Sequence, residues 1–148
     1  MTMFNKLDHW ADDHHPKLLD LIRIILGLII FLKGLYFISH PNELETLLLS
    51  SKFPWLSFAI GHYVAFAHLV GGPLIIIGMF TRLAVLVQIP ILLGAVIFVN
   101  APMGFFTPNS DLPLSLMALA LLIFYFFYGS GYWSVDHQWR KDEESQSA

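Results

Sequence analysis

Four long apolar runs, separated by short polar or turn-forming stretches, dominate the hydropathy pattern of this chain. They extend over about residues 17–39, 55–79, 82–101 and 112–131. Each run is close to the ~20 residues that an α-helix needs to cross a bilayer. The pattern therefore predicts an all-α integral membrane protein that folds as an antiparallel four-helix bundle.

Turn-forming residues mark the limits of these runs. Pro41 follows the first run, and proline disfavours helix in the residue before it. Asn42 and Glu45 have the spacing of a helix capping box, so we expect a short interfacial helix after the first span. A very tight turn at Arg82 separates the second run from the third. Pro90 falls inside the third run and predicts a kink or a loosened backbone there.

Polar segments flank the membrane domain, which we expect to cover residues 17–131. An even number of spans places residues 1–16 and the tail 132–148 on the same side of the membrane, and the last residues of the tail are expected to fray. The basic residues of that side are Lys6, Lys17, Arg82, Arg140 and Lys141. Lys52 alone lies on the other side, so the positive-inside rule makes both terminal segments cytoplasmic.

The composition is typical of a membrane protein and excludes several kinds of partner and cofactor. Of 148 residues, 56% are hydrophobic and only 13% are charged, which leaves little material for a soluble domain. The net charge of -3 argues against nucleic acid as a partner. The absence of cysteine excludes thiol–disulfide chemistry, cysteine-ligated zinc and iron–sulfur clusters. The acidic residues and histidines of the first 16 residues match no standard metal spacing, so we expect no metal there and a solvated segment.

Small residues form a stripe on the second span. The stripe comprises Gly61, Ala65, His68 and Gly72. At 3.6 residues per turn, these residues lie within about 40° of one another around the helix. On the first span, one face holds Arg23, Gly27 and Gly34. Stripes of this kind are where neighbouring helices approach closely in a membrane.

Several polar side chains lie within the spans, where lipid cannot satisfy them. The candidates for a ligand-binding site are Lys33, His62, His68, Gln88 and Arg23. Embedded polar groups usually face the interior of the bundle or a cavity. No acidic residue lies near the middle of a span to neutralise them. We expect the first four of these residues to line one pocket, displaced toward the outer side of the membrane.

Such a pocket suits an oxygen-rich headgroup. Quinone carbonyls accept hydrogen bonds from lysine, histidine and glutamine, and a histidine can exchange a proton as a quinone is reduced. An anion or a lipid phosphate would use the same donors. In the alternative interpretation, Lys33 extends to the interface and the histidines bond neighbouring helices, each bond contributing about 0.6 to 2 kcal/mol. Haem is not expected, because His62 and His68 point about 120° apart and no other span holds a histidine.

Two charged residues are expected to serve turns rather than chemistry. Arg82, together with Thr81, caps the tight turn and meets the anionic inner leaflet. Asp136 is expected to organise the turn after the fourth span and to pair with Arg82 or Arg23.

Three glycine-containing segments in this order resemble the DoxX family, a group of small bacterial and archaeal membrane proteins with four helices. The segments read RIILGLIIFLKG in the first span, GGPLIIIGMFTRLA across the tight turn, and GSGYWSVD after the fourth span. Many members carry a glutamate shortly before the double glycine, where this chain has His68. Many also carry a lysine a few residues after the first-span glycine, whereas Lys33 here directly precedes Gly34.

The resemblance implies a protein of the bacterial cytoplasmic (inner) membrane. Some relatives resemble a subunit of thiosulfate:quinone oxidoreductase, and others look like scaffolds that join redox-stress proteins. We therefore expect a quinone-linked redox accessory subunit, with quinone as its cofactor and with lipids and another membrane protein subunit, or a second copy, as partners. Any catalysis would depend on the cofactor or the partner, because the chain has no nucleotide fingerprint.

The alternative is a non-catalytic assembly or scaffold subunit. In that case the small-residue faces, Gly27 with Gly34 or the stripe of the second span, would contact another protein chain. Solute transport is less favoured, because four spans are few for an alternating-access device.

Overall fold

The computed structural model describes residues 17–42, 46, 57–101, 104 and 111–147. The predicted N-terminal segment and most of the predicted interfacial helix lie outside these residues. The elements are α2 (Lys17–Ser39), α4 (Ser57–Ile77), α5 (Thr81–Gly94), the π-helix η2 (Ala95–Asn100), α6 (Leu112–Tyr128) and α7 (Val135–Ser147). No strand occurs among the described residues, which agrees with the predicted all-α class.

Among the described residues, three stretches of helix are long and apolar enough to cross a membrane. They are α2, Ala59–Ile77 within α4, and Thr81–Asn100, in which α5 continues directly into η2. Helix α6 is a shorter apolar helix of 17 residues. It ends at Tyr128 rather than at residue 131, because Gly129 has φ 90°, a conformation that favours glycine and stops a helix. The chain is thus a membrane protein, with three candidate spans in the part that the structure describes.

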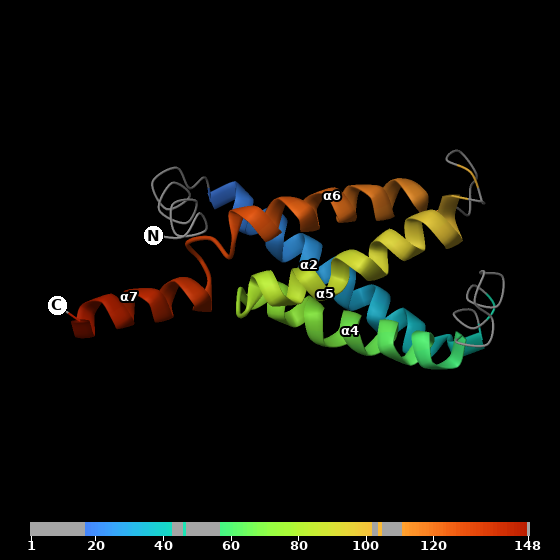
Figure 1. Ribbon diagram of the computed structural model, residues 1–148, viewed down its shortest axis with the longest axis horizontal. Coiled ribbons are helices and arrows are strands. Elements are labelled where there is room, and N and C mark those ends of the chain that lie inside the picture. Colours follow the sequence, from blue (N-terminus) through green and yellow to red (C-terminus); the bar gives the residue numbers. More distant parts are fainter. Residues whose placement is uncertain (1–16, 43–45, 47–56, 102–103, 105–110, 148) are drawn as a thin grey trace.

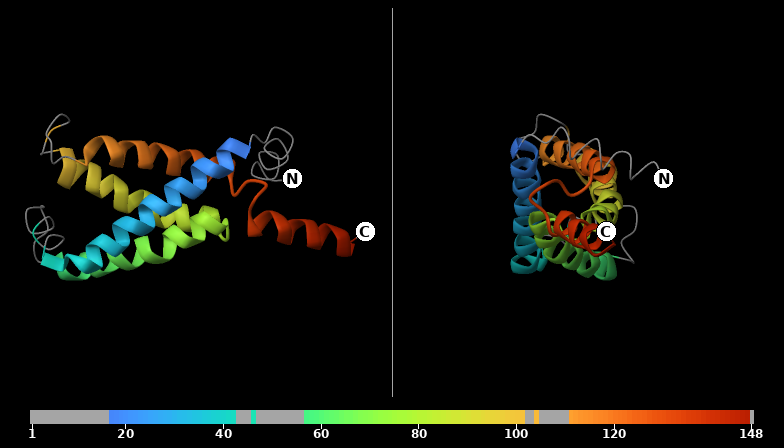
Figure 2. Two further views of the ribbon diagram at one scale, coloured as in Figure 1. Left: turned by 180° about the vertical axis from the view of Figure 1, so that it is seen from behind. Right: turned by 90° about the vertical axis from the view of Figure 1, so that its left-hand side faces the viewer.

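Consecutive apolar helices run antiparallel and form two pairs (Figure 1). Helix α2 packs against α4, α5 packs against α6, and the pairs meet along α4 and α5. We call the end that holds the start of α2 the Lys17 end, and the opposite end the Ser39 end. Figure 2 shows that the two pairs diverge toward the Ser39 end, while α7 extends away from the bundle beyond the Lys17 end.

Glycines bring α2 and α4 into backbone contact. A Cβ atom added to Gly27 would lie 2.8 Å from the Gly72 carbonyl oxygen, and one added to Gly72 would lie 2.8 Å from the Phe31 Cα. A Cβ on Gly34 would lie 2.9 Å from the His68 Cβ. The predicted close approach therefore occurs inside this chain. The expectation that these glycines contact another protein is wrong, because the neighbouring helix of the same chain already covers them.

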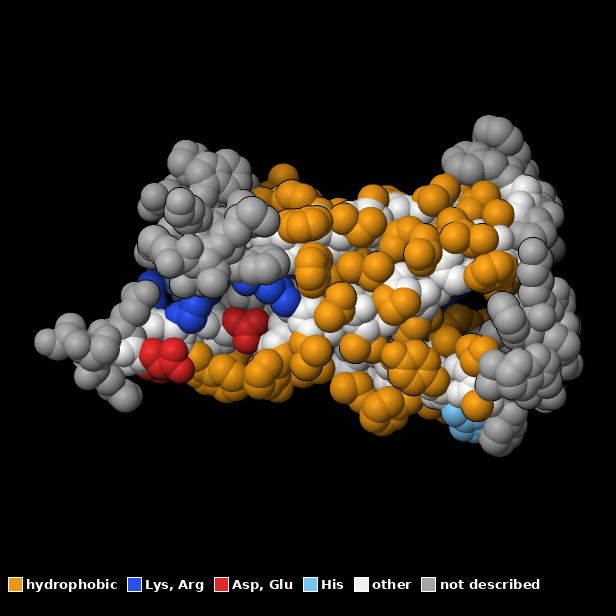
Figure 3. Space-filling model, in the orientation of Figure 1, with side chains coloured by type: hydrophobic (Ala, Val, Ile, Leu, Met, Phe, Trp, Pro, Cys, Tyr) orange, Lys and Arg blue, Asp and Glu red, His pale blue; other side chains and the backbone are white. Residues whose placement is uncertain are grey.

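Large apolar side chains face both the interior and the outside of the molecule. Leu26, Ile75 and Val85 are among the core residues that are at most 1% exposed. The outer surfaces of the same helices are also apolar (Figure 3), with Leu83 and Phe66 more than half exposed. A helix that is apolar all round belongs in a membrane or a large core, so this surface is suited to lipid.

The tight turn between α4 and α5 is closed by a residue from far along the chain. Gly78 and Phe80 have positive φ angles of 70° and 48°. The carboxylate of Asp136 accepts hydrogen bonds from the backbone N–H groups of Phe80 (2.8 Å) and Thr81 (3.1 Å). Asp136 thus caps the start of α5, where Arg82 lies in the first turn, instead of organising the turn after α6.

The C-terminal tail forms helix α7. Ser134 caps this helix, since its hydroxyl oxygen accepts a hydrogen bond from the His137 N–H at 3.1 Å. The ring of Trp139 packs edge-to-face on Phe80, with 5.9 Å between ring centroids. Capping and this aromatic contact with the α4–α5 turn hold the start of α7 to the bundle.

Candidate functional site

A cavity of about 540 Å³ lies between the two helix pairs toward the Ser39 end. Figure 3 shows the surface hollowed at this place. The apolar part of its wall includes Ile29, Ile30, Phe37, Ile60, Val64, Leu92, Phe98 and Leu114. Gly94 also lines the cavity, and a Cβ atom added there would meet no atom within 4 Å. The volume is within the ~300–1,000 Å³ of typical small-ligand sites.

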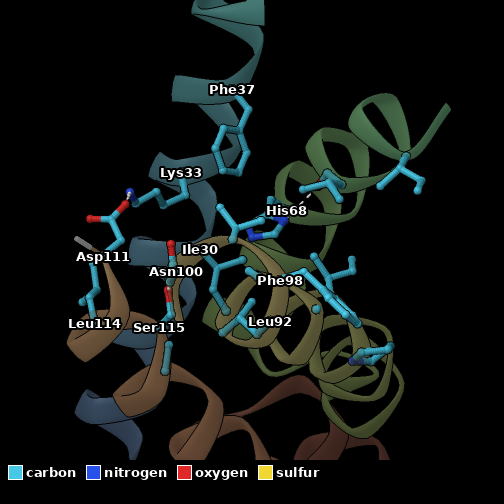
Figure 4. Close-up of a pocket in the computed structure, with 18 of the residues that line it drawn as sticks. Ile30, Lys33, Phe37, His68, Leu92, Phe98, Asn100, Asp111, Leu114 and Ser115 are labelled. Atoms are coloured by element: carbon cyan, nitrogen blue, oxygen red, sulfur yellow. Dashed lines mark hydrogen bonds and ion pairs between the residues drawn. The ribbon is translucent and has the colours of Figure 1, made fainter. Parts of the chain in front are cut away.

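Polar side chains gather at one side of this cavity, as Figure 4 shows. Lys33 from α2 forms an ion pair with Asp111, the residue that precedes α6. Asn100, at the end of η2, donates a hydrogen bond from Nδ2 to the Ser115 hydroxyl at 2.8 Å. The antiparallel order of the helices places all four residues toward the Ser39 end. Asp111 lies just outside the apolar run of α6, so Lys33 has a carboxylate partner although no acidic residue lies near the middle of a span.

His68 projects from α4 into the same cavity (Figure 4) and is only 5% exposed. Its Nδ1 lies 2.8 Å from the backbone carbonyl oxygen of Val64, one turn earlier in the helix. The edge of the ring meets Phe37 of α2, with 5.7 Å between centroids. The missing side chain of Gly34 leaves room for this position, so helix packing and the site share a residue.

A family model described as DoxX matches residues 18–101, which is more than half of the chain. The chain belongs to the DoxX family. The matched residues include the first two segments of the resemblance, with Lys33 and His68, while GSGYWSVD lies beyond them. No curated protein and no solved structure matches this DoxX protein.

The structure separates the predicted site residues of the DoxX chain. Lys33 and His68 line the cavity, whereas His62 and Gln88 do not. His62 is exposed on the outside of α4. Gln88 is fully buried between helices, and its Nε2 donates to the Ala67 carbonyl oxygen of α4 at 2.7 Å. The expectation that these residues share one pocket is thus wrong for His62 and Gln88.

Arg23, the fifth predicted site residue, lies at the Lys17 end and away from the cavity. It is fully buried, its Nη2 donates to the Trp133 carbonyl oxygen at 2.6 Å, and Nη1 lies 3.8 Å from Asp20 Oδ1. The Trp133 N–H in turn donates to Asp20 Oδ2 at 3.2 Å. Tyr125 of α6 donates to the Leu19 carbonyl oxygen at 2.6 Å. This cluster ties α2 to α6 and to the segment after it.

Three residues of the site were not among the predicted ones: Asn100, Asp111 and Ser115. Their signal was their position, since each lies where an apolar run begins or ends on the side of Lys33. Together with Lys33 and His68 they give the cavity one polar side and otherwise apolar walls. Such a cavity suits an amphiphile with a polar headgroup. In the described part of the chain, no three His, Asp or Glu side chains gather as a metal site.

Proposed function

We propose that this DoxX protein is a quinone-linked redox accessory subunit of the bacterial inner membrane. The observation that supports the proposal is the amphipathic cavity, whose polar groups gather at the Ser39 end while its other walls are apolar. A quinone has the same division, because its oxygen-bearing ring is attached to an apolar chain. The ring would lie near Lys33 and His68, and the chain would leave between the diverging helix pairs.

The proposal includes an arrangement in the membrane. Helices α2, α4, α5 with η2, and α6 would cross as a four-helix bundle, since 17 residues are at the short end of what spans a bilayer. The basic residues toward the Lys17 end are Lys17, Arg82, Arg140 and Lys141. The positive-inside rule then makes that end cytoplasmic and places the polar side of the cavity near the outer surface.

The residues of the cavity fit a quinone headgroup. The Lys33 ammonium has three N–H donors, of which Asp111 occupies one, and the Ser115 hydroxyl can donate as well. These groups would orient the ring, and the apolar walls would keep water from it. A bound quinone would supply two-electron redox chemistry, with the electrons coming from a partner protein.

The scaffold alternative is not favoured by the packing. Its prediction used the small-residue faces as contacts with another chain, and the structure uses Gly27, Gly34 and Gly72 between α2 and α4. A partner subunit would instead meet other surfaces of the molecule.

The test is to purify the protein in mild detergent and to analyse the lipids that it retains by mass spectrometry. We expect a near-stoichiometric quinone that is lost from Lys33→Met and from His68→Leu. His62→Leu is the matched control, because this histidine lies on the same helix but outside the cavity. Absence of quinone from the wild-type protein, together with a reproducible protein partner, would refute the redox function in favour of the assembly subunit.

A further inference from the structure

The polar atoms that the cavity leaves for a ligand point to a particular redox state. We infer that the site prefers the reduced, hydroxyl-bearing form of its headgroup, a quinol, over the oxidised quinone. The inference rests on the proposed function. It concerns which donors and acceptors remain after the protein has made its own hydrogen bonds.

His68 offers an acceptor. A carbonyl oxygen can only accept, so the contact of 2.8 Å with Val64 requires that Nδ1 carries the hydrogen. In the neutral ring the other nitrogen, Nε2, then has a lone pair and no hydrogen. A quinol hydroxyl can donate to this atom. A quinone carbonyl in the same place would set its own lone pairs against that of the ring.

The Lys33 ammonium keeps N–H donors, which do not distinguish the two forms, because a hydroxyl oxygen accepts a hydrogen bond as a carbonyl oxygen does. The residues around Lys33 supply acceptors. The amide nitrogen of Asn100 donates one of its two hydrogens to Ser115, and the amide oxygen Oδ1 is an acceptor. Asp111 is a carboxylate, which only accepts. It also neutralises Lys33 through their ion pair, and the two charges sum to zero. A neutral site of this kind favours an uncharged headgroup over an anion such as a lipid phosphate.

The quinone and the quinol differ at the oxygen atoms that would face these acceptors. Reduction converts each carbonyl acceptor into a hydroxyl that can donate. One added hydrogen bond of ordinary strength contributes about 0.5–1.5 kcal/mol, which corresponds to roughly a two- to thirteenfold difference in dissociation constant. We expect the quinol to bind more tightly than the quinone by that factor.

The experiment compares decylubiquinone with its reduced form by titration calorimetry of the detergent-purified protein, kept free of oxygen. In the wild-type protein the reduced form should bind about two- to thirteenfold more tightly. His68→Leu removes Nε2 and should weaken binding of both forms, but that of the reduced form more, so that the ratio of the two dissociation constants falls toward one. Asp111→Asn keeps the side-chain shape but releases the Lys33 ammonium, so it should strengthen binding of the oxidised form. His62→Leu should leave the ratio unchanged.

The outcomes separate this inference from the proposed function. Equal affinity for both forms in the wild-type protein, or tighter binding of the oxidised form, overturns the preference while leaving a quinone site in place. A preference that survives in both His68→Leu and Asp111→Asn also overturns it, because other atoms must then select the ligand. Binding of neither form by the wild-type protein overturns the proposed function, and the inference with it.

Discussion

Gly72→Ala tests whether backbone contact between α2 and α4 determines the stability of the bundle. The added methyl would lie 2.7 Å from the Cβ and 2.8 Å from the Cα and the backbone nitrogen of Phe31. Carbon atoms pack best at about 3.5–4.0 Å, so the helices must separate by roughly 0.7 Å or more. Phe31 cannot give way by changing its rotamer, because the obstruction includes its backbone.

We expect Gly72→Ala to lower the free energy of unfolding by about 1–3 kcal/mol, the usual cost of overpacking. Gly94→Ala is the matched control, since a methyl at Gly94 meets nothing within 4 Å. There the gain in helix propensity of alanine over glycine should raise stability by up to about 1 kcal/mol. The two identical substitutions should thus change stability in opposite directions.

The assay is titration of the detergent-solubilised protein with sodium dodecyl sulfate, followed by far-ultraviolet circular dichroism. A Gly72→Ala protein that unfolds within about 0.5 kcal/mol of wild type would refute the reasoning, because a surface substitution has an effect of that size. Equal losses in both variants would also refute it, since they would show that glycine flexibility matters rather than helix contact.

Two further substitutions test the long-range contacts at the Lys17 end by the same titration. Asp136→Ala removes the cap on the N–H groups of Phe80 and Thr81 and should cost about 0.5–2 kcal/mol; no loss would show that water caps α5 equally well. Tyr125→Phe removes the hydrogen bond to the Leu19 carbonyl oxygen and should cost about 0.6–1.7 kcal/mol. A more stable Tyr125→Phe protein would contradict that estimate.

The helical part of the fold follows from local sequence. Hydropathy and the length needed to span a bilayer locate each apolar run, and the first run, 17–39, has the same bounds as α2. The stripe of small residues also predicts where helices touch, because only small side chains allow backbones so close. The stripe does not identify which helix makes the contact. The small-residue faces could therefore be assigned to another protein, although α2 and α4 contact each other through them.

The site depends on information that no single span contains. Depth along a helix can be counted, and it correctly places Lys33 toward one end. The rotation of each helix about its axis is set by its neighbours. The small-residue stripe singles out His68, which faces the cavity, but depth alone placed His62, which faces outward, in the same pocket. The pairing of Lys33 with Asp111 joins residues 78 positions apart and depends on how α2 and α6 are arranged.

The segment after α6 has a consequence for how the chain matures. Arg23 and Asp20 lie on α2, the first of the described helices to be synthesised, yet their hydrogen-bonding partner Trp133 is 110 residues further from Arg23 along the chain. Until that segment emerges from the ribosome, the buried guanidinium lacks its carbonyl acceptor and the α4–α5 turn lacks the Asp136 carboxylate. Residues that are synthesised late therefore complete the bundle, and a chain that ended before Trp133 would lack the final contacts of this cluster.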